Sequence, residues 1–111
     1  MDIAIDFDGV LCREAWPEIG EENKAATEWV RKAKENGHKI ILWTCRTGKE
    51  LEEALEWCFF RGIVFDAVNE NLPERTKKYG SDPRKIGADL YIDDKSTTWE
   101  AIQNGSYQHF H

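Results

Sequence analysis

The chain has 111 residues, of which 41% are hydrophobic and 32% charged, and its formal net charge is −6 at pH 7. This length suits one core, so we expect a single domain over residues 1–111. The negative charge argues against long nucleic acids and anionic membranes as partners. No apolar stretch approaches the roughly 18 residues of a membrane span, so we expect no membrane-spanning segment.

The N-terminus and the cysteines indicate a compartment. No basic segment followed by an apolar one opens the sequence, so we expect no signal peptide. Cys12, Cys45 and Cys58 are odd in number and unclustered, which fits reduced thiols better than a disulfide framework or a zinc site. These features predict a cytoplasmic protein. For Cys12 and Cys45, which lie near the motifs described below, both a buried thiol and an oxidation-sensitive one remain open.

The first half of the chain alternates between strand and helix patterns. Residues 3–5 form a short apolar run of strand character, and a loop over 7–22 follows. Apolar residues spaced by three and four predict a helix over 23–36. A glycine then ends this helix, and a buried strand is expected over 38–43.

The second half continues the alternation. It is predicted to contain a helix over 49–60, strands over 63–65 and 90–92, and a short last helix that begins with a capping box at Thr97. Residues 66–88 form a long polar connection between the two strands. Alternation of this kind implies a mostly parallel sheet with right-handed crossovers. The fold class predicted is therefore α/β, with the three layers of an α/β/α sandwich.

Polar side chains follow three of the predicted strands. Asp6 and Asp8 follow the first strand, Thr44 follows the second, and Asp93 and Asp94 follow the fourth. In a parallel sheet the carboxyl ends of the strands lie at one edge, so these residues should converge there. Carboxylates that can attack phosphorus, move a proton and hold Mg²⁺, together with a hydroxyl donor, make up much of what phosphoryl transfer requires.

These segments resemble the four motifs of the haloacid dehalogenase-like superfamily of Mg²⁺-dependent phosphatases. Residues 6–11 resemble its first motif and residues 40–44 its second. Lys85 resembles the basic residue of the third motif, and residues 90–94 resemble the fourth. Arg84 and Lys78 remain alternatives for the third motif. The resemblance implies a superfamily fold without a cap domain, since neither insertion point has room for a folded cap.

The resemblance implies a role for each matched residue. Asp6 would attack phosphorus and form an aspartyl-phosphate. Asp8 would protonate the leaving oxygen and then act as the base for the attacking water. Thr44 and Lys85 would hold the phosphoryl oxygens.

The resemblance also implies Mg²⁺ as the cofactor. Its ligands would be a carboxylate oxygen of Asp6, the main-chain carbonyl of Asp8 and one acid of the 93/94 pair. We favour Asp94 as the direct ligand, with Asp93 turned toward Lys85. The metal and the lysine would offset the repulsion between a carboxylate and a phosphate dianion.

Further basic residues are candidates for substrate binding. Arg46 lies in the turn after Thr44, where it could contact phosphate or remain a surface arginine. Lys77 and Lys78 belong to a basic stretch over 75–85 that could form a small lid, together with Asn69 and Asn71, or a solvated charged surface. An open site suits a phosphorylated small molecule or a macromolecule presented by a partner. Trp57 and Phe60 fall off the core stripe of the second helix, which leaves a homo-oligomer open.

Three other functions remain open at this stage. A signalling receiver domain also clusters aspartates around Mg²⁺, and Asp66 would then be its phosphoacceptor. A catalytically silent binding module could keep the fold without turnover. Phosphotransfer to an acceptor other than water would use the same intermediate on Asp6.

Overall fold

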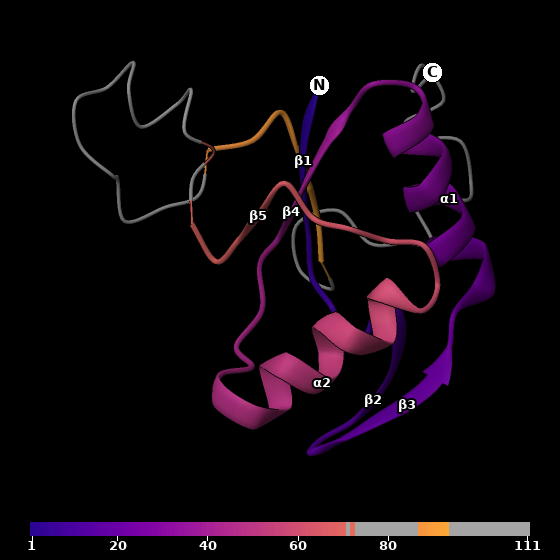
Figure 1. Cartoon of the computed structure of the whole chain (residues 1–111), viewed down its shortest axis with the longest axis vertical. Helices are drawn as coiled ribbons and strands as arrows, with labels where there is room; N and C mark the ends of the chain where they lie inside the picture. The colour runs from indigo at the N-terminus through magenta and orange to yellow at the C-terminus, as the bar shows by residue number, and fades with distance from the viewer. Residues whose placement is uncertain (71, 73–86, 94–111) are drawn as a thin grey trace.

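The computed structural model describes residues 1–70, 72 and 87–93 (Figure 1). Its elements follow in chain order: β1 (Asp2–Ile5), β2 (Cys12–Ala15), β3 (Glu18–Glu22), α1 (Lys24–Glu35), β4 (Lys39–Leu42), α2 (Gly48–Phe59), β5 (Ala67–Val68) and β6 (Leu90–Ile92). No helix of the described part is both long and apolar enough to cross a membrane.

Four strands form a parallel sheet in the order β5-β4-β1-β6. The central strand β1 places Ile3 opposite Ile40 of β4 on one side and Leu90 of β6 on the other. Because all four strands run in one direction, their carboxyl ends share one edge. The parallel arrangement therefore brings the residues that follow β1, β4 and β6 to the same edge of the sheet.

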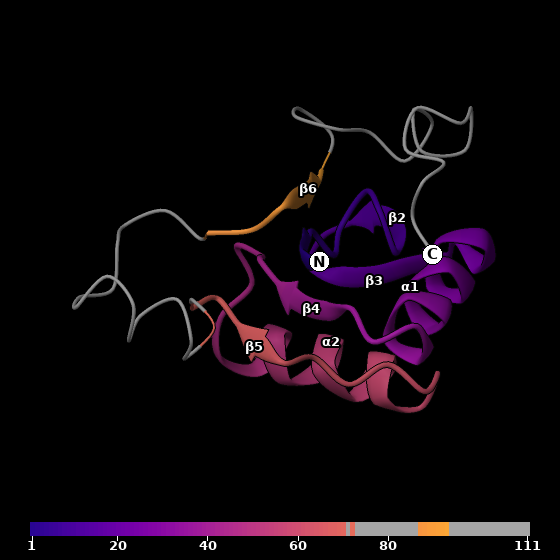
Figure 2. The ribbon, with the colours of Figure 1, turned by 90° about the horizontal axis from the view of Figure 1, so that it is seen from above.

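Both described helices cover the same face of the sheet (Figure 2). Successive strand residues point to opposite faces, so Ile3 and Ile5 pack into the larger core cluster with Val30 of α1 and Cys58 of α2. Ala4 packs on the other face in a smaller cluster. The α/β class and the mostly parallel sheet are confirmed, but the described residues form two layers and do not establish a three-layer sandwich.

Helix α1 begins where its sequence predicts. The side chain of Asn23 accepts a hydrogen bond from the main-chain N–H of Ala26, at 3.3 Å, and satisfies one of the free donors of the first turn. The helix ends at Glu35, and Gly37 follows with φ at +86°, a conformation that glycine adopts without strain. Both ends agree with the expected helix over 23–36 to within one residue.

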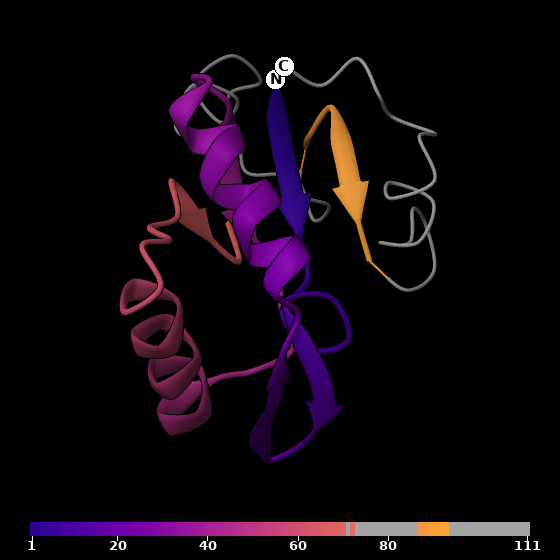
Figure 3. The ribbon, with the colours of Figure 1, turned by 90° about the vertical axis from the view of Figure 1, so that its right-hand side faces the viewer.

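The segment after β1 is not the loop predicted for 7–22. It contains the antiparallel hairpin of β2 and β3, which extends beyond the carboxyl end of β1 (Figures 1 and 3). Both strands are rich in charged residues, and Cys12 is their one buried residue, so apolar alternation does not mark them. Gly20 reveals the close pairing, because a β-carbon there would overlap the main-chain carbonyl of Arg13.

The third strand of the sheet is shorter and later than predicted. Residues 63–65 are not a strand, although Ile63 is buried in the larger core. The chain joins the sheet only at Asp66, whose N–H donates to the Ile40 carbonyl at 2.8 Å, and β5 follows within the predicted connection 66–88. The helix predicted from Thr97 lies outside the described residues.

Candidate functional site

The carboxyl edge of the sheet holds a pocket of about 460 Å³. Asp6 follows β1, Thr44 follows β4 and Asp93 follows β6, and all three line this pocket. Trp43 and Tyr91 also contribute to its wall. The structure thus brings together three of the residues that the sequence places at separate strand ends.

Main-chain hydrogen bonds fix Asp6 at the junction of two strands. Its N–H donates to the Ile92 carbonyl of β6 at 3.0 Å. Its Oδ1 accepts from the N–H of Phe7 at 2.7 Å, which orients the carboxylate. A carboxylate held in this way has little orientational freedom left to lose when it contacts a ligand.

Thr44 is held by the end of β5. Its N–H donates to Oδ1 of Asn69 at 2.8 Å, and its hydroxyl oxygen accepts from the N–H of Arg46 at 3.1 Å. Asn69 has φ at +53°, a left-handed conformation that asparagine tolerates better than most residues. Asn69 was expected only as part of a lid, and this positioning contact was not anticipated.

Asp8 does not share the orientation of Asp6. The described residues that line the pocket do not include Asp8, whose side chain is 19% exposed. Its two oxygens accept from Arg46, with Nε–Oδ2 and Nη2–Oδ1 distances of 2.8 Å each. A fork of this kind is the strongest geometry available to an arginine–carboxylate pair.

Arg46 is 1% exposed, so it is not the surface arginine that the sequence left open. Besides Asp8, its Nη1 donates to the carbonyl of Pro17 at 3.2 Å and its Nη2 to that of Glu18 at 2.8 Å. Its guanidinium carbon lies 5.2 Å from the ring centroid of Phe7 and 5.1 Å from a ring centroid of Trp16. These partners all lie within the protein, whereas the sequence left contact with a substrate phosphate open for Arg46.

The surroundings of Arg46 keep it charged. Hydrogen bonding to Asp8 raises the pKa of the guanidinium above its ordinary value, although burial opposes this shift. The two aromatic rings add a favourable contact with the cation. Arg46 is therefore a fixed positive charge that links the loop after β1 to the tip of the hairpin.

The three cysteines are free and differ in accessibility. Burial, followed by the negative charge of Asp8, raises the pKa of the Cys12 thiol to about 11. Burial raises the pKa of the Cys58 thiol to about 12. Cys45 is exposed and lines the pocket beside Thr44. Of the two thiols expected near the site, Cys12 is protonated at neutral pH, and only Cys45 is open to solvent.

Comparison with known proteins places the chain beside one solved structure. A conserved protein from Bacteroides thetaiotaomicron superposes with a TM-score of 0.82 at 38% sequence identity, over 98% of this chain and 91% of that one. This chain belongs to the same family as that protein. No family model and no curated protein matches the sequence. The match therefore shows a shared fold and does not indicate a reaction.

Several expected site residues lie outside the described part of the chain: Asn71, Lys77, Lys78, Arg84, Lys85 and Asp94. Within the described part, no group of three or more acidic, histidine or cysteine side chains is arranged to hold a metal. Asp6 and Asp93 nevertheless line one pocket, and carboxylate oxygen is a donor that Mg²⁺ prefers. The donor chemistry of the pocket therefore fits the expected ion.

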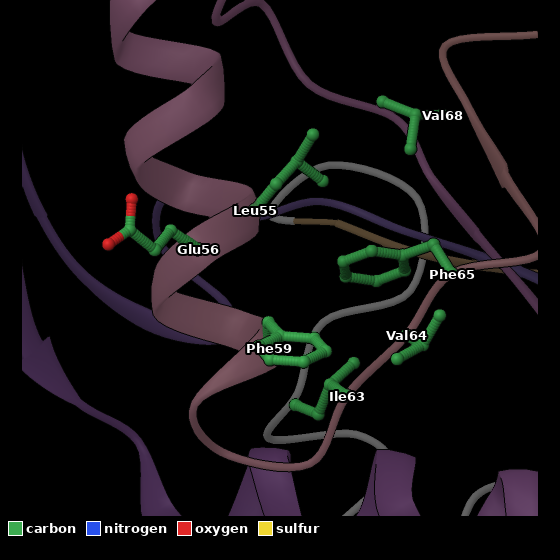
Figure 4. A pocket seen from close by; sticks show the side chains of 7 residues that line it. All are labelled: Leu55, Glu56, Phe59, Ile63, Val64, Phe65 and Val68. Atoms are coloured by element: carbon green, nitrogen blue, oxygen red, sulfur yellow. The ribbon is translucent and has the colours of Figure 1, made fainter.

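A second hollow lies at the end of α2 and has different chemistry (Figure 4). It is lined mainly by apolar side chains, including Leu55, Phe59, Val64 and Phe65, while the carboxylate of Glu56 points away from them. It offers no arrangement for phosphate chemistry. Of the two aromatic residues considered for an interface, Phe60 is 74% exposed, whereas the Trp57 ring packs edge-on against Phe7 at 5.4 Å.

Proposed function

We propose that this protein is a Mg²⁺-dependent phosphomonoester hydrolase, a capless member of the haloacid dehalogenase-like superfamily, that acts through an aspartyl-phosphate on Asp6. The observation that carries the proposal is the convergence of Asp6, Thr44 and Asp93 on one pocket at the carboxyl edge of a parallel sheet. The free cysteines are consistent with a reducing compartment, for which we propose the cytoplasm.

In the first step, a carboxylate oxygen of Asp6 forms a bond to phosphorus while the bond from phosphorus to the leaving oxygen breaks. Asp8 gives its proton to that leaving oxygen. The hydroxyl oxygen of Thr44 already accepts from the N–H of Arg46, so its hydrogen is available to a phosphoryl oxygen.

In the second step, Asp8 takes a proton from water as the water oxygen attacks phosphorus. The bond between phosphorus and Asp6 breaks, which releases inorganic phosphate and restores the carboxylate. A carboxylate oxygen of Asp6, the Asp8 carbonyl and one acid of the 93/94 pair, for which we favour Asp94, would hold Mg²⁺, whose positive charge would offset the repulsion between nucleophile and phosphate.

The experiment that tests the proposal is hydrolysis of p-nitrophenyl phosphate with Mg²⁺ and with EDTA. We expect turnover that requires Mg²⁺ and falls by at least about a thousandfold in Asp6→Asn, since the nucleophile is lost. Asp66→Asn is the matched control, because its carboxylate pairs with Lys34 and the Ile40 N–H and does not line the pocket. Equal activity of wild type and Asp6→Asn would refute the proposal.

The receiver alternative is not favoured by the position of Asp66. A receiver phosphoacceptor ends the third strand, but Asp66 comes just before β5 and hydrogen-bonds to Ile40 near the start of β4. Phosphotransfer remains distinct from hydrolysis, and adding methanol would reveal it as methyl phosphate among the products. Mg²⁺ binding without turnover of any ester would instead favour a silent binding module.

A further inference from the structure

We propose that Arg46 is a positioning residue for Asp8 and couples this acid–base group to the tip of the β2–β3 hairpin. The inference rests on the proposed function of Asp8. One guanidinium hydrogen-bonds to both oxygens of Asp8 and to the carbonyls of Pro17 and Glu18. The acid–base group and the hairpin tip therefore share a single buried cation.

The contacts that Arg46 makes require an arginine and cannot all be made by a lysine. Four of its five N–H donors are used, in two directions set by the planar fork. The rings of Phe7 and Trp16 lie near the guanidinium, each about 5 Å away. A lysine ammonium is a point charge that cannot bind a carboxylate through two parallel bonds or stack as a plane. Arg46→Lys thus keeps the positive charge and removes the pair of parallel hydrogen bonds to Asp8.

The contact with Arg46 fixes the orientation of Asp8 and leaves part of its carboxylate unoccupied. An ionised carboxylate has about four lone-pair sites, and the fork occupies two of them. The remaining sites are fixed in direction, as required for a group that must reach a leaving oxygen in the transition state. A base oriented by a third group is the same arrangement that activates nucleophiles in other hydrolases.

Because Arg46 contacts the hairpin, the position of the Asp8 carboxylate can depend on the substrate. Trp16 is 54% exposed at the hairpin tip and lies over the guanidinium. A leaving group that contacts Trp16 is therefore one residue away from the cation that orients Asp8. A leaving group that reaches the hairpin tip would therefore act on the orientation of Asp8 through Arg46.

The first test uses two esters with different needs for an acid. p-Nitrophenolate leaves readily without a proton, whereas the alkoxide of glycerol 2-phosphate does not. We expect Arg46→Lys to lower kcat/KM, which reports the first step and not the shared hydrolysis of the aspartyl-phosphate, at least about tenfold more on glycerol 2-phosphate than on p-nitrophenyl phosphate, as in Asp8→Asn. Arg13→Lys, an exposed arginine of the same hairpin, is the matched control. Equal losses of kcat/KM on both esters would overturn a positioning role in the first step, and a rise in KM with kcat unchanged on both would indicate direct phosphate binding instead.

The second test does not depend on turnover. Hydrogen exchange of the hairpin amides should quicken severalfold in Arg46→Lys and in Asp8→Asn, and no further in the double variant, because both changes break one linkage. Unchanged exchange, or additive effects, would overturn the coupling. If the wild-type protein hydrolyses neither ester, the proposed function fails while this measurement still decides whether Arg46 joins Asp8 to the hairpin.

Discussion

Asp8 and Arg46 are 38 positions apart in the sequence and meet through two hydrogen bonds of 2.8 Å each. The pair is asymmetric in exposure, with 19% of the Asp8 side chain and 1% of the Arg46 side chain accessible. Removing the more exposed partner would therefore leave a buried cation without its counter-ion. Loss of Asp8 alone is therefore expected to destabilise the fold.

We expect Asp8→Ala to lower the free energy of unfolding by about 3 kcal/mol, because a buried guanidinium loses its carboxylate. Urea unfolding followed by tryptophan fluorescence measures this change. Asp6→Asn is the comparison, since its oxygen can still accept from the Phe7 N–H and no buried cation is exposed. Similar losses in the two variants would show that Arg46 does not depend on Asp8.

Asn69 offers a way to separate a hydrogen bond from a backbone conformation. Asn69→Gly keeps the left-handed conformation and removes the acceptor of the Thr44 N–H, whereas Asn69→Ala loses both. We expect a loss of about 1 kcal/mol for glycine and about 2 kcal/mol for alanine, measured by urea unfolding. A glycine variant as stable as wild type would mean that the Thr44 contact contributes nothing.

The hairpin should be sensitive to a single methyl group at Gly20. A β-carbon there would overlap the Arg13 carbonyl, so Gly20→Ala must push the strands apart. We expect a loss of about 1–3 kcal/mol and faster exchange of the hairpin amides, as for other overpacked positions. Glu21→Ala, at the exposed neighbouring position, should change neither quantity. Wild-type stability in Gly20→Ala would argue against the close pairing.

The thiols should react in two classes. With Ellman's reagent at pH 8 we expect one thiol per chain, Cys45, to react rapidly, because the other two are buried and their pKa values lie at about 11 and about 12. Cys45→Ser should abolish the fast phase and leave two thiols that react only after unfolding. Slowing of the fast phase by vanadate, an analogue of phosphate, would agree with the place of Cys45 in the pocket.

Glu22 predicts an acid-dependent loss of stability. A hydrogen bond from the Thr27 hydroxyl, followed by contact with Arg61, holds the pKa of Glu22 below its ordinary value. The resulting stabilisation is present above the unfolded-state pKa, near 4.5, and is lost as the pH falls through the lower folded-state pKa. Glu22→Gln should lower stability at pH 7 by about 1 kcal/mol and have little effect near pH 3. Urea unfolding at both values checks this, and an equal loss at both would contradict it.

Elements with strong periodicity were predictable from the sequence. The predicted helices agree with α1 and α2 to within one residue at each end, and β4 and β6 lie within their predicted ranges. Their apolar residues pack into a core, so the pattern and the structure share one cause. The same pattern misplaced the third strand. Ile63 packs into the hydrophobic core, but it lies before β5 and is not part of the sheet.

The candidate site was predictable only where it depends on strand ends. The meeting of Asp6, Thr44 and Asp93 follows from parallel strands and needs no knowledge of side-chain contacts. The ion pair between Asp8 and Arg46 was not predictable, because it depends on where the hairpin lies after β1. The hairpin itself lacks an apolar pattern, since its strands are largely exposed.

The order of the strands has a consequence for how the protein acquires its site during synthesis. Ile3 near the start of the chain is paired with Leu90 of β6, while β4 and β5 join the sheet from sequence that is made earlier. A nascent chain that ends before β6 can assemble β5-β4-β1 and present Asp6 and Thr44, but it lacks Asp93. Contacts between such distant residues form slowly because a long loop must close first. Completion of the pocket therefore has to await the synthesis of β6, so a chain that ends before β6 carries an incomplete site.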